Sequence, residues 1–155
     1  MLLNQFAEYA LRASVYLASL KYAEFAAASE VAEHTNVPIH YLQKVLRQLT
    51  KRGILNARRG MGGGFCLSRE TDRITIYEVL RACDSEPKRI TECPLGIGAH
   101  FNLCPLHHLI DEQIASIEVA FKATTLRDIM ESKREVKALC KSESMVPLGI
   151  DCSDD

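Results

Sequence analysis

The segment that decides the fold is residues 38–67, PIHYLQKVLRQLTKRGILNARRGMGGGFCL. Its apolar side chains first recur at helical spacing, at Leu42, Val45, Leu46 and Leu49. Proline suits the first turn of a helix and glycine suits its end, so the stretch from Pro38 to Gly53 predicts one helix. Residues 54–55 and 65–69 have the composition of two short strands around a glycine-rich turn. The segment therefore predicts a helix followed by a β-hairpin.

A further short helix is expected just before this segment, because Ser29 is a good N-cap residue for a helix that runs to about His34. Two helices joined by a tight turn predict a helix-turn-helix. The polar face of its second helix combines side chains that read bases with side chains that bind phosphate. The residues predicted to project from this face are His40, Tyr41, Gln43, Lys44, Arg47 and Lys51.

The turn of the hairpin contains four glycines and follows two arginines, Arg58 and Arg59. The glycines resemble a nucleotide-binding run, but no Lys-Ser/Thr pair follows them, and they lead into a strand instead of a helix. A basic hairpin beside a helix-turn-helix is better interpreted as a wing. Such a wing lies over the minor groove of DNA with Arg58 or Arg59 inserted.

The charges support this interpretation without deciding it. The net charge is −1, yet residues 1–75 contain ten Lys or Arg against six acids, and residues 76–155 contain nine against fourteen. A basic cluster is the electrostatic signature of a contact with a phosphate backbone, although many basic faces are merely solvated. At 155 residues and 47% hydrophobic residues, the chain is long enough for one compact domain with a helical extension.

Four more helices are expected elsewhere in the chain. Residues 2–20 have helical spacing and no Gly or Pro, and Glu8 is the one acid on their apolar side, where a carboxylate must be exposed, paired or bound to a cation. Thr75 opens a short helix, and Thr125 with Asp128 forms a capping box for another that extends to about residue 140. Pro105 opens a long helix with an apolar stripe, which packs either on the first helix or on the same helix of a second subunit.

These elements predict a mainly α fold with a small β-hairpin wing: a winged helix-turn-helix followed by a long dimerisation helix. The expected domains are residues 1–82 for DNA binding, residues 83–104 as a Cys/His loop, residues 105–131 for dimerisation, and residues 132–155 as a partly mobile extension.

The loop of residues 92–108, ECPLGIGAHFNLCPLHH, contains two cysteines and three histidines. Such a segment has little apolar bulk to bury, and a bound metal would supply the free energy that orders it. Cys104 caps the long helix and His107 lies one turn later, so the two side chains can share a metal. The absence of a C-x2-C pair disfavours a zinc ribbon and favours an iron-sulphur cluster, with zinc second. The alternative is that Cys93 and Cys104 are simply two thiols in a loop.

Six cysteines, at positions 66, 83, 93, 104, 140 and 152, suggest metal binding or redox sensing if the protein is cytoplasmic, because disulfides are rare in that compartment. A cytoplasmic location is expected because the N-terminus has no leading basic residues and no apolar run reaches the length of a membrane span. No membrane partner is therefore expected.

Several of these stretches resemble the winged-helix regulators typified by IscR and NsrR. The matching stretches are AEYALRASVYLA, PIHYLQKVLRQLTKRGIL, RRGMGGGFCLSR, ITIYEVLRACD, CPLHHL and TTLRDI, within residues 1–131. The resemblance implies a bacterial homodimeric transcription factor that binds a double-stranded DNA operator. It also implies an iron-sulphur cluster near the dimer interface, whose state changes the affinity for DNA. Tyr41, Gln43 and Arg59 match positions that contact DNA in this family.

The resemblance also implies a set of metal ligands. Cys93 and Cys104 match the first and last cysteines of the family's three-cysteine pattern, and His100 stands nearest the middle one. Glu8 matches a carboxylate ligand supplied by the other subunit in some members. The set resembles that of the RsrR type, whose [2Fe-2S] cluster has two Cys, one His and one Glu ligand, so [2Fe-2S] is favoured over [4Fe-4S]. The histidine ligand is expected to be His100, His34 or His107, in that order.

The function expected is therefore a regulator switched by the state of its cluster. A regulator of the same fold that uses a cysteine thiol switch or a zinc site is the alternative. An enzyme or electron carrier built on the cluster is disfavoured, because the sequence has no nucleophile and base set and no cofactor loop, and the basic wing has no role in such a protein.

Overall fold

The computed structural model describes residues 3–93 and 103–132 of the chain. The expectations for His100 and for a mobile tail with Cys140 and Cys152 fall on residues outside these ranges. The expected last helix does not continue unbroken to about residue 140, because the helix that follows Thr125 ends at Met130, with Glu131 as its C-cap. No helix within the described ranges is long and apolar enough to span a membrane.

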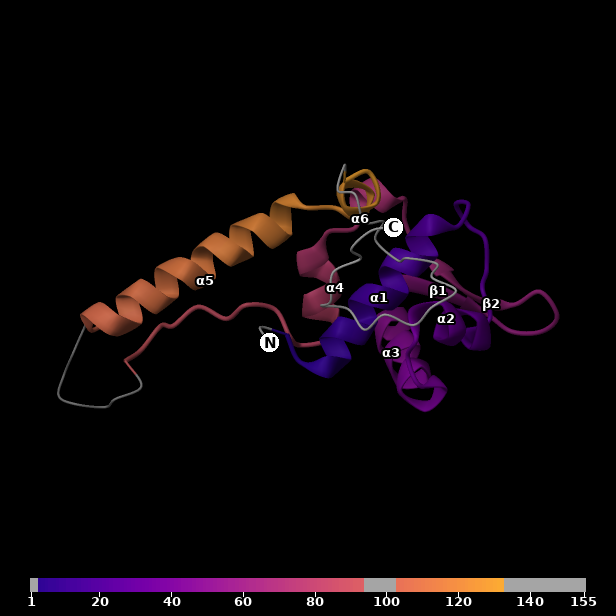
Figure 1. Ribbon diagram of the computed structural model, residues 1–155, viewed down its shortest axis with the longest axis horizontal. Helices are drawn as coiled ribbons and strands as arrows, with labels where there is room; N and C mark the ends of the chain where they lie inside the picture. Colours follow the sequence, from indigo (N-terminus) through magenta and orange to yellow (C-terminus); the bar gives the residue numbers. More distant parts are fainter. Residues whose placement is uncertain (1–2, 94–102, 133–155) are drawn as a thin grey trace, which may run out of the picture.

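The fold is mainly helical with one small hairpin, as the sequence predicts. The elements are α1 (Gln5–Ser19), α2 (Ala28–Thr35), α3 (Ile39–Lys51), β1 (Leu55–Arg58), β2 (Gly64–Leu67), the 3-10 turn η1 (Thr71–Arg73), α4 (Ile76–Ala82), α5 (Pro105–Ala123) and α6 (Leu126–Met130). Figure 1 shows α1 to α4, α6 and the hairpin gathered in one body, with α5 projecting from it.

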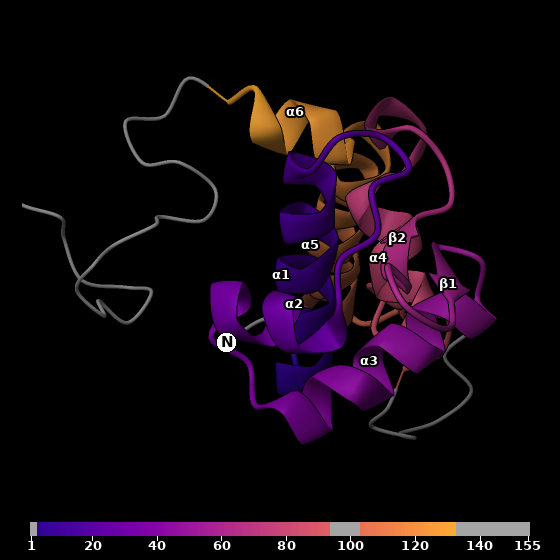
Figure 2. The same ribbon diagram turned by 90° about the vertical axis from the view of Figure 1, so that its right-hand side faces the viewer.

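Helix α1 runs through the middle of this body and contacts α2, α3, α4 and α6. Figure 2 shows α6 at one end of α1 and α3 crossing the other end. Three fully buried alanines, Ala7, Ala10 and Ala13, allow neighbouring helices to approach α1 closely. The predicted inner side of α3 is confirmed, because Leu42, Val45, Leu46 and Leu49 are all completely buried. Each buried leucine contributes roughly 1.5–3 kcal/mol of transfer free energy, so this face fixes the orientation of α3.

Two helix starts show what the sequence reveals and what it does not. Asn4 caps α1, its side chain accepting a hydrogen bond from the N–H of Ala7 at 2.8 Å. Ser29 is not the cap of α2, because the helix begins at Ala28 and Ser29 lies in its first turn. The reason is a β-bridge just upstream, in which Ala26 and Phe65 exchange two backbone hydrogen bonds of 3.0 and 2.9 Å. This bridge holds Ala26 in an extended conformation. The helix therefore starts at Ala28, two residues earlier than a cap at Ser29 would place it.

The hairpin is longer at its tip than the sequence suggests. Strand β1 pairs antiparallel with β2 from Leu55 opposite Leu67 to Arg58 opposite Gly64, so Arg58 belongs to a strand. Gly64 has a φ of +141°, and a Cβ atom there would lie 2.2 Å from the carbonyl oxygen of Ala26. Glycine is therefore required for the hairpin to reach the chain that precedes α2.

Residues 84–93 run outward from the body alongside α5 to its N-terminal end, and α5 leads back to the body (Figure 1). Its C-terminal end is fixed by backbone hydrogen bonds, from the N–H of Ile76 to the carbonyl of Thr124 (3.0 Å) and from the N–H of Leu126 to that of Ile74 (2.9 Å). The predicted capping box at Thr125 is present and starts α6. Helix α5 packs on α4, and none of its nineteen residues is fully buried. The C-terminal part of its apolar stripe is half-buried at Ile114, Ile117 and Phe121, with Phe121 packed against the core, whereas Leu106 and Ile110 near its start are exposed.

Candidate DNA-binding surface and Cys/His group

The outer face of α3 has the side chains that the sequence predicts. His40, Tyr41, Gln43, Lys44, Arg47 and Lys51 are all exposed. Tyr41 is held by its neighbours, because the Tyr9 ring on α1 meets it edge-on at 6.2 Å and the Lys44 ammonium lies 5.7 Å from its ring centre. A tyrosine fixed in this way presents its hydroxyl at a defined position. The face thus has a positioned aromatic residue followed along the helix by three cations, Lys44, Arg47 and Lys51.

The two wing arginines differ in their surroundings. The guanidinium of Arg58 lies 4.3 Å from the centre of the Phe25 ring and donates a 2.6 Å hydrogen bond to the carbonyl of Gly62. Arg58 therefore joins the wing to the loop before α2 and closes the turn. The Arg59 guanidinium is exposed, and within residues 3–93 and 103–132 it has no hydrogen bond or ion pair. Of the two candidates, Arg59 is thus the one available to enter a groove.

Three potential metal ligands meet at the start of α5. Cys104 is the N-cap residue and His107 lies in the first turn. Cys93 ends the segment of residues 84–93, which runs alongside the helix. Their ligand atoms all lie within 4.8 Å of one another. The Nδ1 atom of His107 is 3.1 Å from the sulphur of Cys104 and 3.5 Å from that of Cys93. Two ligands of one tetrahedral zinc ion, at about 2.3 Å for sulphur and about 2.0 Å for nitrogen, lie roughly 3.5 Å apart. The group therefore has the spacing of ligands around one metal ion.

The other proposed ligands lie elsewhere in the chain. Glu8 on α1 accepts a hydrogen bond of 3.1 Å from Arg12. This ion pair accounts for a carboxylate on the apolar side of the helix. His34 stacks on Tyr16 with ring centres 4.8 Å apart, and its Nδ1 lies 2.9 Å from the carbonyl oxygen of Glu30. Neither Glu8 nor His34 belongs to the Cys/His group of its own chain. Of the two histidine candidates within the described residues, His34 and His107, the structure brings His107 to the thiols.

Cys66 and Cys83 are poor candidates for a reactive thiol. Burial raises the pKa of the Cys66 thiol, partly offset by the charge of Arg58. Burial, with the negative charge of Asp84, raises the pKa of Cys83 to about 11. Because the thiolate is the reactive form, both residues should react slowly at neutral pH.

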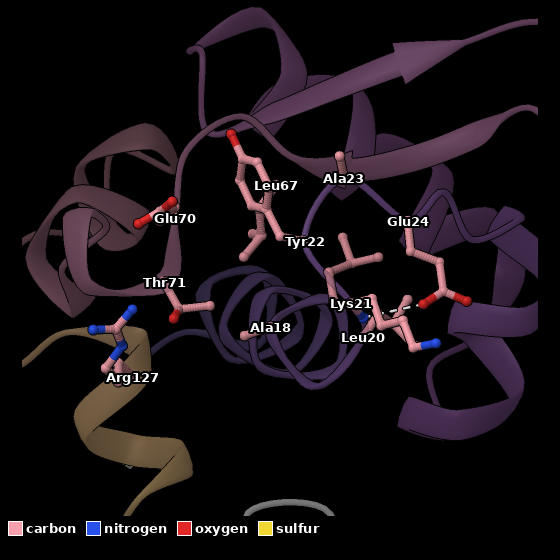
Figure 3. Close-up of a pocket in the computed structure, with 11 residues that line it drawn as sticks. Ala18, Leu20, Lys21, Tyr22, Ala23, Glu24, Leu67, Glu70, Thr71 and Arg127 are labelled. Carbon is pink, nitrogen blue, oxygen red and sulfur yellow. Dashed lines mark hydrogen bonds between the residues drawn. The ribbon is translucent and has the colours of Figure 1, made fainter.

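A cavity of about 310 Å³ lies at the C-terminal end of α1 (Figure 3). Figure 3 shows Lys21 and Glu24 on one side of it and Glu70 and Arg127 on the other. Two of its charged side chains already have partners, because Arg127 pairs with Asp72 at 3.0 Å and the Glu24 carboxylate accepts the backbone N–H of Lys21 at 3.0 Å. None of the residues predicted for DNA or metal binding lines this cavity.

One relevant pair of residues was not recognised in the sequence. Asp111 on α5 accepts hydrogen bonds from the Arg89 guanidinium and from the backbone N–H of Ile90. These partners are separated by 22 and 21 residues and come from an irregular segment, so no periodic pattern links them. The contact of Arg58 with Phe25 was missed for the same reason.

The fold and the exposed basic face define a winged helix-turn-helix protein of the kind that regulates transcription. Residues 3–132 match the model of the Rrf2 family, described as an iron-dependent transcriptional regulator. The chain belongs to this family, which confirms the resemblance to IscR and NsrR regulators.

Individual relatives agree with this assignment. The chain is 29% identical to the HTH-type transcriptional regulator NsrR of Bacillus subtilis, over 91% of this chain and 98% of that protein. It is 31% identical to a putative HTH-type transcriptional regulator of Aquifex aeolicus, over 84% and 92%. The solved structure of CymR, the global cysteine regulator of B. subtilis, has the same fold, with a TM-score of 0.68 at 23% identity over 81% and 93%. These relatives are named as regulators and not as enzymes.

Proposed function

We propose that this protein is a homodimeric DNA-binding regulator whose operator affinity depends on an iron-sulphur cluster held by the Cys/His group. The observation that supports the proposal most is the convergence of Cys93, Cys104 and His107 at one end of α5. The other end of α5 is hydrogen-bonded into the DNA-binding body through Ile74 and Ile76. One rigid helix therefore connects the metal-binding side chains with the domain that carries the basic face.

The chemistry of the donors suits the cluster. Two thiolates and one imidazole are the ligands expected for an iron centre of mixed donors, and the family description names iron. Glu8 of the partner subunit would complete the set, replacing its ion pair with Arg12 by a bond to iron. With only two thiolates in the group, a [2Fe-2S] cluster is favoured over [4Fe-4S]. When bound, the cluster would supply a redox-active centre that ties the three side chains together.

The dimer is proposed from the uncovered face of α5. Four large apolar side chains on this helix are at least 40% exposed: Leu106, Leu109, Ile110 and Val119. Leu106, Leu109 and Ile110 share one side of the first turns of α5, where they can form a seam with the same residues of a second copy. Such a seam is isologous, so it would place two basic faces with the two-fold symmetry that palindromic half-sites require. A homodimer by sedimentation that dissociates on Ile110→Glu would support this part.

Residues on α1 relate the two functions. Glu8, the proposed ligand for the partner's cluster, is followed by Tyr9, whose ring supports Tyr41 on the outer face of α3. Coordination would draw Glu8 away from Arg12, which itself lies 6.0 Å from the Tyr9 ring. A change at the metal therefore alters the surroundings of a DNA-facing side chain without unfolding any element. Such a device shifts operator affinity only if the cluster favours one arrangement of these side chains over the other.

A second function is favoured by one specific observation. The spacing of the three donors matches the ligands of a single tetrahedral ion, whereas a [2Fe-2S] cluster distributes its ligands over two irons and needs a wider set. A regulator that holds one zinc ion here, or that oxidises Cys93 and Cys104 as a thiol switch, is therefore the alternative. Both versions keep the same fold, the same DNA-binding surface and the same dimer.

The experiment is anaerobic reconstitution of the full chain with iron and sulphide, followed by metal and sulphide analysis and operator binding. The proposal expects iron and sulphide in equal amounts, a visible absorption spectrum, and operator affinity that changes when the cluster is lost. The variant Cys104→Ser should lose all three, whereas Cys66→Ser serves as the matched control and should retain them. Zinc without sulphide in the wild-type protein would support the alternative, and unchanged redox-responsive binding by Cys104→Ser would refute both.

A further inference from the structure

We propose that Asp111 is a positioning residue for the Cys/His group: it clasps Arg89 and Ile90 against α5 and thereby sets where Cys93 lies. The consequence for metal affinity rests on the proposed function, but the position of the Cys93 thiol in the metal-free protein does not. The clasp is the single Asp111 carboxylate with its donors from Arg89 and Ile90.

The geometry of the clasp is well defined. Oδ1 of Asp111 accepts the Nε–H of Arg89 at 2.7 Å and the backbone N–H of Ile90 at 2.8 Å, and Oδ2 accepts a second hydrogen bond from the same guanidinium. The Asp111 side chain is only 13% exposed, whereas that of Arg89 is 50% exposed. The bonds from Arg89 and then from Ile90 lower the pKa of Asp111 to about 2, so its carboxylate is charged at any physiological pH.

The position of the clasp explains its effect on the group. Cys104, His107 and Asp111 are spaced by three and four residues, which places them along one side of α5. The chain of residues 89–93 runs along this side, with Ile90 bonded at Asp111 and Cys93 next to His107. Only Thr91 and Glu92 lie between Ile90 and Cys93, and an extended chain spans about 3.3–3.6 Å per residue. While Ile90 is bonded, Cys93 must therefore stay within roughly 10 Å of it, and release of Ile90 removes this restraint on the position of the thiol.

A purely structural role would have a different signature. A partly exposed ion pair contributes little to folding stability, so loss of this one should leave the fold intact. What changes is the preorganisation of a ligand. Groups that orient metal ligands from outside the coordination shell typically alter metal affinity by about 10- to 100-fold when they are removed. Because Asp111 acts on Cys93 through three intervening residues, we expect a loss near the lower limit, about tenfold.

The test compares Asp111→Asn with a matched control, Glu112→Gln. Glu112 is the next residue of the same helix, has the same charge, and forms only an exposed pair with His108 at 3.7 Å. In the metal-free full-length protein, the rate at which a short bifunctional thiol reagent links Cys93 to Cys104 is measured by mass spectrometry of the digested product. In parallel, Co²⁺ affinity is measured from the thiolate-to-cobalt absorption, and the melting temperature is recorded for each variant.

We expect Asp111→Asn to slow the linking reaction severalfold and to weaken Co²⁺ binding about tenfold, with Glu112→Gln equal to wild type and all melting temperatures similar. Arg89→Gln, which retains the Ile90 bond, should fall between them. Linking rates of Asp111→Asn and Arg89→Gln equal to that of wild type would overturn the clasp. If Asp111→Asn alone fails to fold, the linking rate and Co²⁺ affinity of Arg89→Gln test the clasp in its place. The failure of wild-type protein to take up iron and sulphide would refute the proposed function instead, because the linking rate involves no metal.

Discussion

The different surroundings of Arg58 and Arg59 lead to a prediction about the wing. Replacement of Arg59 by alanine should leave stability unchanged, because its guanidinium has no partner within the described residues. If Arg59 enters the minor groove, its loss should cost about 1–3 kcal/mol of binding free energy, or roughly 5- to 150-fold in affinity. It should also reduce the slope of log K against log salt by about 0.9, the value for one neutralised phosphate.

Arg58→Ala should behave in the opposite way. It removes the contact with the Phe25 ring, worth about 0.5–1 kcal/mol at an exposed site, and a hydrogen bond to Gly62 worth a similar amount. A local loss of about 1–2 kcal/mol should speed hydrogen exchange of the wing-tip amides roughly 5- to 30-fold. The salt slope should change less than in Arg59→Ala, because the remaining effect on DNA binding is indirect.

The assay is fluorescence anisotropy over a range of salt concentrations with a duplex selected from a random pool, together with hydrogen exchange of the free protein. Lys88→Ala is the control for nonspecific loss of positive charge, since Lys88 lies on the segment after α4 and not on α3 or the wing. A slope reduced by about one in Arg58→Ala but not in Arg59→Ala would show that the roles of the two arginines had been assigned the wrong way round.

Three further predictions concern the histidines, the core and the cysteines. His107→Ala should weaken Co²⁺ binding by on the order of 100-fold or more, whereas His34→Ala should leave it within about twofold and lower the melting temperature through a lost ring stack; equal losses in Co²⁺ titrations would contradict this. Leu126→Ala should cost about 2–5 kcal/mol in urea unfolding, because this leucine is fully buried between α6 and α1, and a cost under about 1 kcal/mol would mean that α6 does not anchor α5. Cys83, with its pKa raised from 9.0 to about 11, should have about 100-fold less thiolate than an ordinary cysteine near pH 7.5, so alkylation followed by mass spectrometry should find it slow until the pH approaches 11.

The sequence predicted those parts of the fold that depend on local patterns. The inner face of α3, the capping box at Thr125 and the glycine turn of the wing all follow from spacing or from the backbone conformation of one residue, and all are present. The start of α2 was predicted wrongly because a contact between Ala26 and Phe65, 39 residues apart, determines it. Backbone pairing over that distance overrides the preference of Ser29 for a cap.

The candidate site was harder to predict than the fold, for the same reason. Cys104 and His107 are one turn apart at the start of α5, so their proximity follows from the sequence. The approach of Cys93 depends instead on the path of residues 84–93 alongside the helix, which no sequence pattern predicts. The ranking of His100, His34 and His107 rested on resemblance, which placed His107 last. The structure places His107 ahead of His34, because the Nδ1 atom of His107 contacts both sulphurs, whereas His100 lies outside the described residues.

The proposed switch requires that binding at one end of α5 change the DNA-binding body at the other end. The C-terminal end of α5 is joined to that body by two backbone hydrogen bonds and by the buried side chain of Leu126, so it cannot slide independently. The N-terminal end is held mainly by side-chain contacts. Asp111 is hydrogen-bonded to Ile90 in the segment of residues 84–93, and His107 contacts the two thiols. A metal that rearranges these contacts can therefore shift the N-terminal end of α5 while its C-terminal end stays joined to the DNA-binding body. If the partner's Glu8 is also a ligand, α1 is pulled from a second point, which makes the response depend on the dimer and not on one chain alone.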